Sequence, residues 1–127
     1  MPDANVPAAL KTWFVVHCIV DLVFAVPLFF FPEKFLALLG WPFFDPLTVR
    51  LVAAALFGIG LESYLGRNGG VERYRGMLRL KIIWSGTATL GILIAMFSLA
   101  EAPVVGWLLA GVFAGFNGVW VWWWRRV

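Results

Sequence analysis

The side chains best suited to chemistry are those of His17 and Asp21, which lie inside a long apolar segment. They are four residues apart, so on a helix they share one face. A histidine exchanges a proton near neutral pH, and a carboxylate can balance a cation or orient the imidazole. Because an ionisable group at membrane depth turns toward other helices or water, we expect this pair to face inward. The pair predicts a charged anchor for a ligand or a proton-exchanging couple.

Further polar side chains interrupt the other apolar segments. Counting inward from the basic ends of these segments, at about 1.5 Å per helical residue, places most of them in the same half of a bilayer. A compact bundle would bring some of them together, with a tryptophan as an aromatic wall. The predicted site comprises His17, Asp21, Glu62, Lys81, Trp84, Ser85 and Asn117.

The composition indicates a membrane protein. Apolar residues make up 62% of the chain and aromatic residues 17%, and the mean hydropathy is +0.89. Segments of about 20 apolar residues match a hydrocarbon core of about 30 Å. The sequence therefore predicts an all-α bundle of four transmembrane helices in a single domain, 1–127. The predicted helices cover residues 12–31, 47–66, 77–98 and 103–124.

The segment 32–41 is too short to span a membrane and too apolar for a solvated loop. Pro32 suits the first turn of a helix, and Glu33 suits its positive end. Gly40 and Pro42 would end that helix. We expect a short interfacial helix here, on the outer side of the membrane, between the first two spans.

Charge placement predicts the orientation of the chain. Eight of the ten basic residues flank one side of the spans, and only Lys34 and Arg50 flank the other. The positive-inside rule then places both termini in the cytoplasm of a multi-pass cell-membrane protein. Because the bilayer accounts for the net charge of +3, we expect no nucleic-acid partner. The eight residues are Lys11, Arg67, Arg73, Arg75, Arg79, Lys81, Arg125 and Arg126.

Small residues at helical spacing predict where helices meet. In the second span, Ala55 and Gly58 share a face with Glu62, so we expect that face to contact another helix and Glu62 to be buried. In the fourth span, Gly111 and Gly115 have the spacing of a helix-dimer motif. These surfaces exceed what one small bundle needs, and we expect a homo-oligomer or a larger membrane complex.

Two interpretations of the polar residues remain open. In the first, they satisfy one another: Glu62 pairs with Lys81, His17 bonds Asp21, and the remaining polar groups bond across helices. Lys81 could instead extend to the headgroups. In the second, they bind a lipophilic or cationic ligand, and an acidic side chain supplies the counter-charge.

The sequence supports two other functional classes, with less specific features. His17 and Asp21 could exchange protons during transport of a small molecule. The same residues could perform acid–base chemistry, such as a double-bond shift, on a lipid-soluble substrate. One histidine and one cysteine, Cys18, do not suffice for a metal site of familiar type, and the residues specify no cofactor. The sequence favours a non-enzymatic role, as a ligand-binding protein or an accessory subunit.

Two families share features with the chain. The sequence IWSG at Ile83–Gly86 resembles the third helix of small four-helix multidrug exporters, whose first helix carries an acidic residue, as Asp21 does here. The basic stretch through Lys81, the interfacial segment and the strong charge bias depart from that pattern. Sterol-isomerase-like membrane proteins also combine buried acids with a histidine, but no motif is shared. The residues identify no family.

Overall fold

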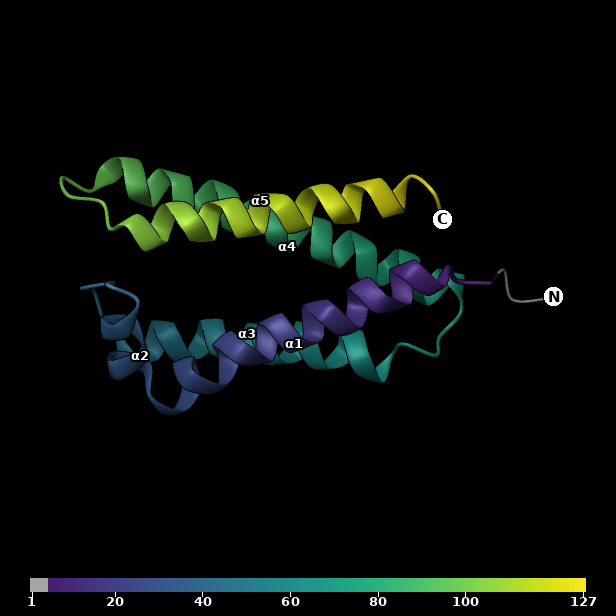
Figure 1. Cartoon of the computed structure of the whole chain (residues 1–127), viewed down its shortest axis with the longest axis horizontal. Coiled ribbons are helices and arrows are strands. Elements are labelled where there is room, and N and C mark those ends of the chain that lie inside the picture. Colours follow the sequence, from purple (N-terminus) through teal and green to yellow (C-terminus); the bar gives the residue numbers. More distant parts are fainter. Residues whose placement is uncertain (1–4) are drawn as a thin grey trace. The chain divides into compact units, whose positions relative to one another are not determined.

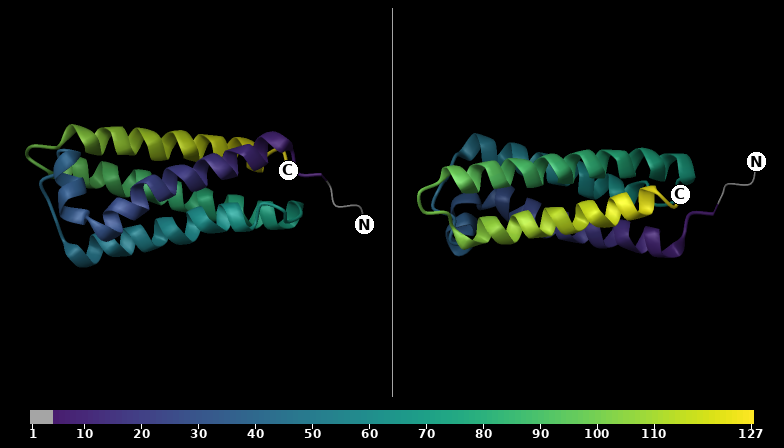
Figure 2. Two further views of the ribbon diagram at one scale, coloured as in Figure 1. Left: turned by 60° about the horizontal axis from the view of Figure 1, so that its bottom comes forward. Right: turned by 90° about the horizontal axis from the view of Figure 1, so that it is seen from above.

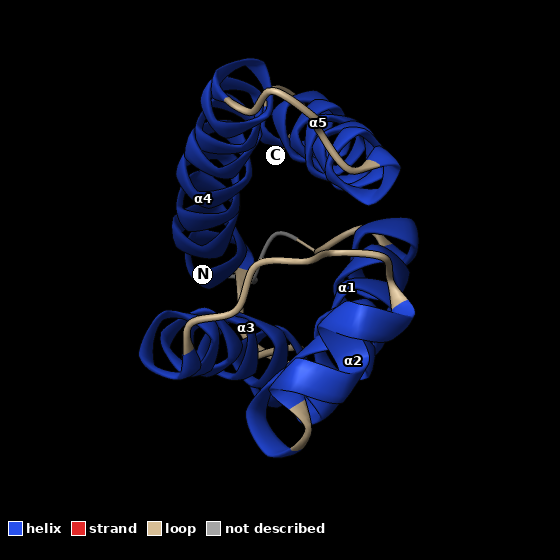
Figure 3. Ribbon diagram, turned by 90° about the vertical axis from the view of Figure 1, so that its left-hand side faces the viewer, coloured by secondary structure: helices blue, strands red, loops and turns tan. Residues whose placement is uncertain are grey.

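The structure is a computed structural model that describes residues 5–127, and these form only helices and loops (Figure 3). Four of its five helices are long and apolar enough to cross a membrane: α1, α3, α4 and α5. This confirms the predicted all-α fold with four helices of spanning length. In chain order (Figure 1), the helices are α1 (Ala8–Phe30), α2 (Pro32–Leu38), α3 (Pro46–Leu65), α4 (Val71–Ser98) and α5 (Val104–Trp124).

Backbone contacts divide the chain into two compact units, one ending at Tyr74 and the other running from Arg75 to Val127. The division falls inside α4. The first unit contains α1, α2 and α3, and the second contains most of α4 and all of α5. The prediction of a single domain, 1–127, stays a prediction.

The helix ends follow local chemistry. The predicted interfacial helix is α2, with Pro32 in its first turn and Glu33 beside it. It ends at Leu38, earlier than expected, and Gly40 then takes a positive φ of 78°, which glycine adopts without strain. Asp45 caps α3: its carboxylate accepts a hydrogen bond from the Thr48 backbone N–H at 2.9 Å.

Helix α4 begins at Val71, six residues before the predicted start of its span. Glu72 lies in its first turn, where a carboxylate favours the positive end of the helix dipole. The basic residues that follow are good helix formers. The polar loop between the second and third predicted spans is therefore shorter than expected.

In the first unit, α1 and α3 lie antiparallel and side by side (Figure 1). The contact face predicted for α3 was wrong, since Gly58 is exposed and a Cβ added there would meet nothing within 4 Å. Helix α3 is apolar on all sides and has small residues on several faces, so spacing alone could not select the buried one. The buried residues are Ala53, Leu56, Gly60 and Ser63.

In the second unit, α4 and α5 run antiparallel along their length (Figure 2). The two helices pack closely at Gly106, where an added Cβ would clash with Met96 Sδ. Four tryptophans lie at the end of α5: Trp120, Trp122, Trp123 and Trp124. Trp120 and Trp123 are buried, whereas Trp122 is 47% exposed. Only part of this tryptophan cluster is thus available to a membrane interface.

Candidate functional site

The centre of the candidate site is the pair formed by His17 and Asp21 on α1. His17 Nε2 lies 3.3 Å from Asp21 Oδ1, and both side chains are nearly inaccessible, at 5% and 6% exposure. This confirms the predicted contact, which the four-residue spacing on a helix produces. A proton on His17 or Asp21 can be exchanged only with groups that contact the pair, because both side chains are almost inaccessible to water.

Gly60 of α3 provides the space for Asp21. A Cβ added at Gly60 would lie 2.7 Å from Asp21 Cβ and 3.3 Å from Asp21 Oδ2. The absence of a side chain therefore lets α3 approach α1 where the carboxylate lies. Sequence reasoning did not single out Gly60. Gly60 lies one turn after Leu56 on the face that is buried in the structure, and the sequence did not distinguish that face from the others.

Two aromatic rings, those of Phe14 and Tyr74, pack against each other one turn from His17 on α1. The ring of Phe14 lies 4.6 Å, centroid to centroid, from that of Tyr74. The Tyr74 hydroxyl donates a 2.7 Å hydrogen bond to the Arg67 carbonyl oxygen, so this ring is held from both ends. The imidazole of His17 therefore has an apolar, rigid neighbour one turn away on α1. Tyr74 was not among the predicted site residues.

The expectation that Glu62 is buried was wrong. Its side chain is 39% exposed and pairs with Arg73. Glu62 lies in the last turn of α3, and the loop after α3 is short enough for the early start of α4 to return Arg73 to it. Glu62 thus belongs to a partly solvated ion pair at the connection between α3 and α4, where solvent screens the attraction.

In the second unit, Asn117 joins α5 to α4. Its side-chain amide donates to the Ile82 carbonyl oxygen at 2.9 Å and to Ser85 Oγ at 3.0 Å. Ser85 in turn donates to the Lys81 carbonyl oxygen at 2.6 Å. The prediction that Ser85 and Asn117 bond across helices is confirmed. Their polar groups are largely satisfied by these bonds.

Lys81 and Trp84 lie near this hydrogen-bonded pair. Lys81 is fully buried, with its Nζ 4.9 Å from the centroid of the Trp120 ring. The alternative in which Lys81 extends to the headgroups is therefore wrong, because the ammonium group lies against an aromatic face. The Trp84 ring packs edge-on against Phe113, and its Nε1 has no hydrogen-bond partner among residues 5–127.

The predicted residues are distributed over both units, and each unit brings some of them together. His17 and Asp21 form one set in the first unit, and Lys81, Trp84, Ser85 and Asn117 lie in the second unit. A site that combines all seven residues stays a prediction. Within the described part of the chain, no group of three or more His, Cys, Asp or Glu side chains is placed to hold a metal ion.

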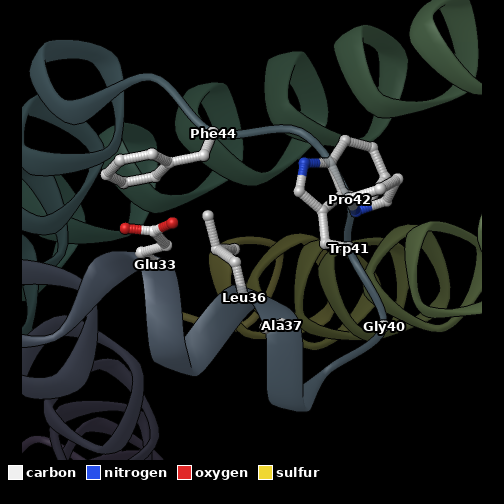
Figure 4. Close-up of a pocket in the computed structure, with 7 residues that line it drawn as sticks. All are labelled: Glu33, Leu36, Ala37, Gly40, Trp41, Pro42 and Phe44. Atoms are coloured by element: carbon white, nitrogen blue, oxygen red, sulfur yellow. The ribbon is translucent and has the colours of Figure 1, made fainter.

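A separate hollow of about 350 Å³ lies between α2 and the loop that follows it (Figure 4). Glu33 and Leu36 project from α2 toward Phe44, and Trp41 stands beside them. The lining contains none of the predicted site residues. It consists of Glu33, Leu36, Ala37, Gly40, Trp41, Pro42 and Phe44.

No family model, curated protein or solved structure matches the chain.

Proposed function

We propose that this chain is a small multi-pass membrane protein that binds a lipophilic or cationic ligand, or serves as an accessory subunit that does so within a larger complex. The pair of His17 and Asp21 supplies the charged anchor. The observation that carries this proposal is the 3.3 Å contact between a histidine and an aspartate that are both almost completely buried in a helix of spanning length.

A contribution to the stability of the fold does not by itself explain why a buried histidine–aspartate pair is present. A buried ion pair adds little stability over apolar residues of similar size, because removing two charges from water costs about as much as their attraction returns. Ionisable groups in membrane segments typically line binding sites or proton paths. A cation or a hydrogen-bonding ligand could compete with His17 for the Asp21 carboxylate and use the surrounding apolar side chains for the rest of its surface.

The proposed setting is the cell membrane, with both termini in the cytoplasm. The unequal distribution of basic residues supports this orientation. A reporter that is active only in the cytoplasm should give signal when fused after Val127 and none when inserted at Glu101, which lies between α4 and α5. The reverse pattern would overturn the orientation.

Assembly with a further helix is part of the proposal. A Cβ at Gly111 or Gly115 would meet nothing within 4 Å, so both glycines leave backbone surface open to another chain. Replacing Gly115 with leucine should shift gently extracted protein toward smaller species in size-exclusion chromatography. An unchanged size would remove this glycine from the proposed interface.

Native mass spectrometry of gently extracted protein tests ligand binding. Wild-type protein should retain a bound small molecule or a partner chain, and Asp21→Asn should lose the small molecule while staying folded. The matched control is Asp45→Asn, the same change at an exposed helix cap, where asparagine caps equally well. This control should retain whatever the wild type retains.

Other outcomes separate the alternatives. Uptake of a cation into liposomes that depends on a pH gradient and on His17 would indicate a proton-coupled transporter. Chemical conversion of the retained molecule would indicate an enzyme. If the wild type carries nothing and Asp21→Asn unfolds the protein, the pair has only a packing role and the proposal fails.

A further inference from the structure

The second unit carries an unbalanced positive charge at one end. From Arg75 to Val127 the sequence has five basic residues and one acidic residue, Glu101. Glu101 lies in the loop between α4 and α5, whereas four of the basic residues lie at the opposite ends of these helices. Those four are Arg75, Arg79, Arg125 and Arg126. Within the unit, no acidic residue lies at this end. Glu72 of α4 lies one turn before Arg75, and among residues 5–127 it forms no ion pair with Arg75 or Arg79.

Two of these arginines share one tryptophan. Arg75 and Arg79 are one turn apart on α4, and their guanidinium carbons lie 4.9 Å and 5.8 Å from the centroid of the Trp124 ring of α5. Arg75 also donates a hydrogen bond to the Val127 carbonyl oxygen. Stacking on an indole restricts a guanidinium while leaving N–H groups at its edge free to donate.

Among residues 5–127, no carboxylate forms an ion pair with Arg79. Arg79 is also exposed. Beyond it along α4, Leu80 and Ile83 are 46% and 64% exposed. An apolar surface therefore continues directly from the paired guanidinium groups toward the middle of a helix of spanning length.

We propose that Arg75, Arg79 and Trp124 form a binding site for the phosphate of an acidic phospholipid. Two planar guanidinium groups one turn apart can both donate to one phosphate, and such charge-assisted bonds are stronger than neutral ones. Trp124 lies at the end of a spanning helix, where tryptophan prefers the headgroup region. The acyl chains lie along the exposed apolar surface of α4. This arrangement favours a lipid over a nucleic acid, which would offer nothing to that surface.

The lysine variant separates a built site from diffuse surface charge. Arg75→Lys/Arg79→Lys keeps both charges but loses the planar, stacked donors. Purified full-length protein is titrated in detergent with phosphatidylglycerol and with phosphatidylcholine, and bound lipid is measured by native mass spectrometry. The wild type should prefer phosphatidylglycerol, and the double variant should bind it about tenfold more weakly, as expected when a charge-assisted hydrogen bond is lost.

The matched control is Arg125→Lys/Arg126→Lys, which makes the same change at the same end of the unit; there, Arg126 stacks on Trp122 instead. This control should bind phosphatidylglycerol as the wild type does. If the double variant at Arg75 and Arg79 does not fold, Arg79→Lys alone carries the test, because its side chain is exposed. Its phosphatidylglycerol affinity should fall while helicity is unchanged.

Three results would overturn the proposal. The first is equal phosphatidylglycerol affinity for the lysine variants and the wild type, which would show diffuse charge only. The second is full displacement of the lipid by an equal concentration of glycerol 3-phosphate, which would show a site for a free phosphate ester. The third is tighter binding of a short single-stranded oligonucleotide than of phosphatidylglycerol.

Discussion

Gly60 of α3 packs directly against Asp21 of α1, so closely that a Cβ on the glycine would lie 2.7 Å from the aspartate Cβ. The contact couples the approach of two helices to the position of the carboxylate. A shift of either helix at the Gly60–Asp21 contact would therefore move the Asp21 carboxylate. The candidate site and the packing of the first unit thus depend on the same pair of residues.

Replacing Gly60 with alanine should therefore destabilise the protein. The Asp21 Cβ cannot move aside as the end of a flexible side chain could, so α1 and α3 must separate, at a cost of about 1–3 kcal/mol. Thermal unfolding followed by circular dichroism in detergent measures the effect. Gly58→Ala is the matched control, since its Cβ would meet nothing within 4 Å. It should be neutral or stabilising, because alanine is the better helix former.

The ion pair between Glu62 and Arg73 should contribute little. The two side chains are 39% and 51% exposed, and solvent screening reduces such a pair to about 0.2–1 kcal/mol. Glu62→Gln and Arg73→Gln should each lower the unfolding free energy within this range, and a double-mutant cycle should return a coupling of the same size. A loss several times larger would show that Glu62 has a second, buried partner.

The cap of α3 should make stability depend on pH in the acidic range. The hydrogen bonds that Thr48 donates to the Asp45 carboxylate, from its hydroxyl and then its backbone N–H, lower the pKa of that group below its ordinary value of 3.8. The stabilisation is therefore complete above the ordinary pKa and is lost as the pH falls through the lowered value.

Asp45→Asn isolates this effect, because asparagine caps the helix but does not titrate in this range. Melting temperatures measured from pH 6 down to about pH 3 should fall more steeply in the wild type than in the variant. Parallel curves for the two proteins would contradict a contribution from Asp45.

Removing the amide of Asn117 should weaken the packing of α4 and α5. Its two hydrogen bonds, to Ile82 and to Ser85, cross between the helices. Polar contacts between membrane helices contribute about 0.6 kcal/mol on average and at most about 1.7 kcal/mol. Asn117→Ala should lower the unfolding free energy by an amount in that range. Ser85→Ala should cost less, since the bond to the Ile82 carbonyl remains; the opposite order would assign the main role to Ser85.

The hydropathy pattern and the residues that begin or end helices were enough to predict the helices. Four long apolar runs must satisfy their backbone hydrogen bonds internally in a bilayer, so each forms a helix. Pro32, Gly40 and the Asp45–Pro46 pair act within a few residues of themselves: α2 begins at Pro32 as predicted, Gly40 takes a positive φ after it, and Asp45 caps α3. The contact between His17 and Asp21 is equally local, because it follows from one helical turn.

Only the tertiary structure decided which faces meet and which charges pair. The apolar surface of α3 has no polar side to distinguish its faces, so the choice of Gly60 over Gly58 depended on how α1 packs against it. Glu62 and Arg73 form an ion pair because the loop between α3 and α4 brings them together. The ammonium group of Lys81 lies against the Trp120 ring of α5. Such contacts join residues of different helices. The spacing of residues within one helix does not predict them.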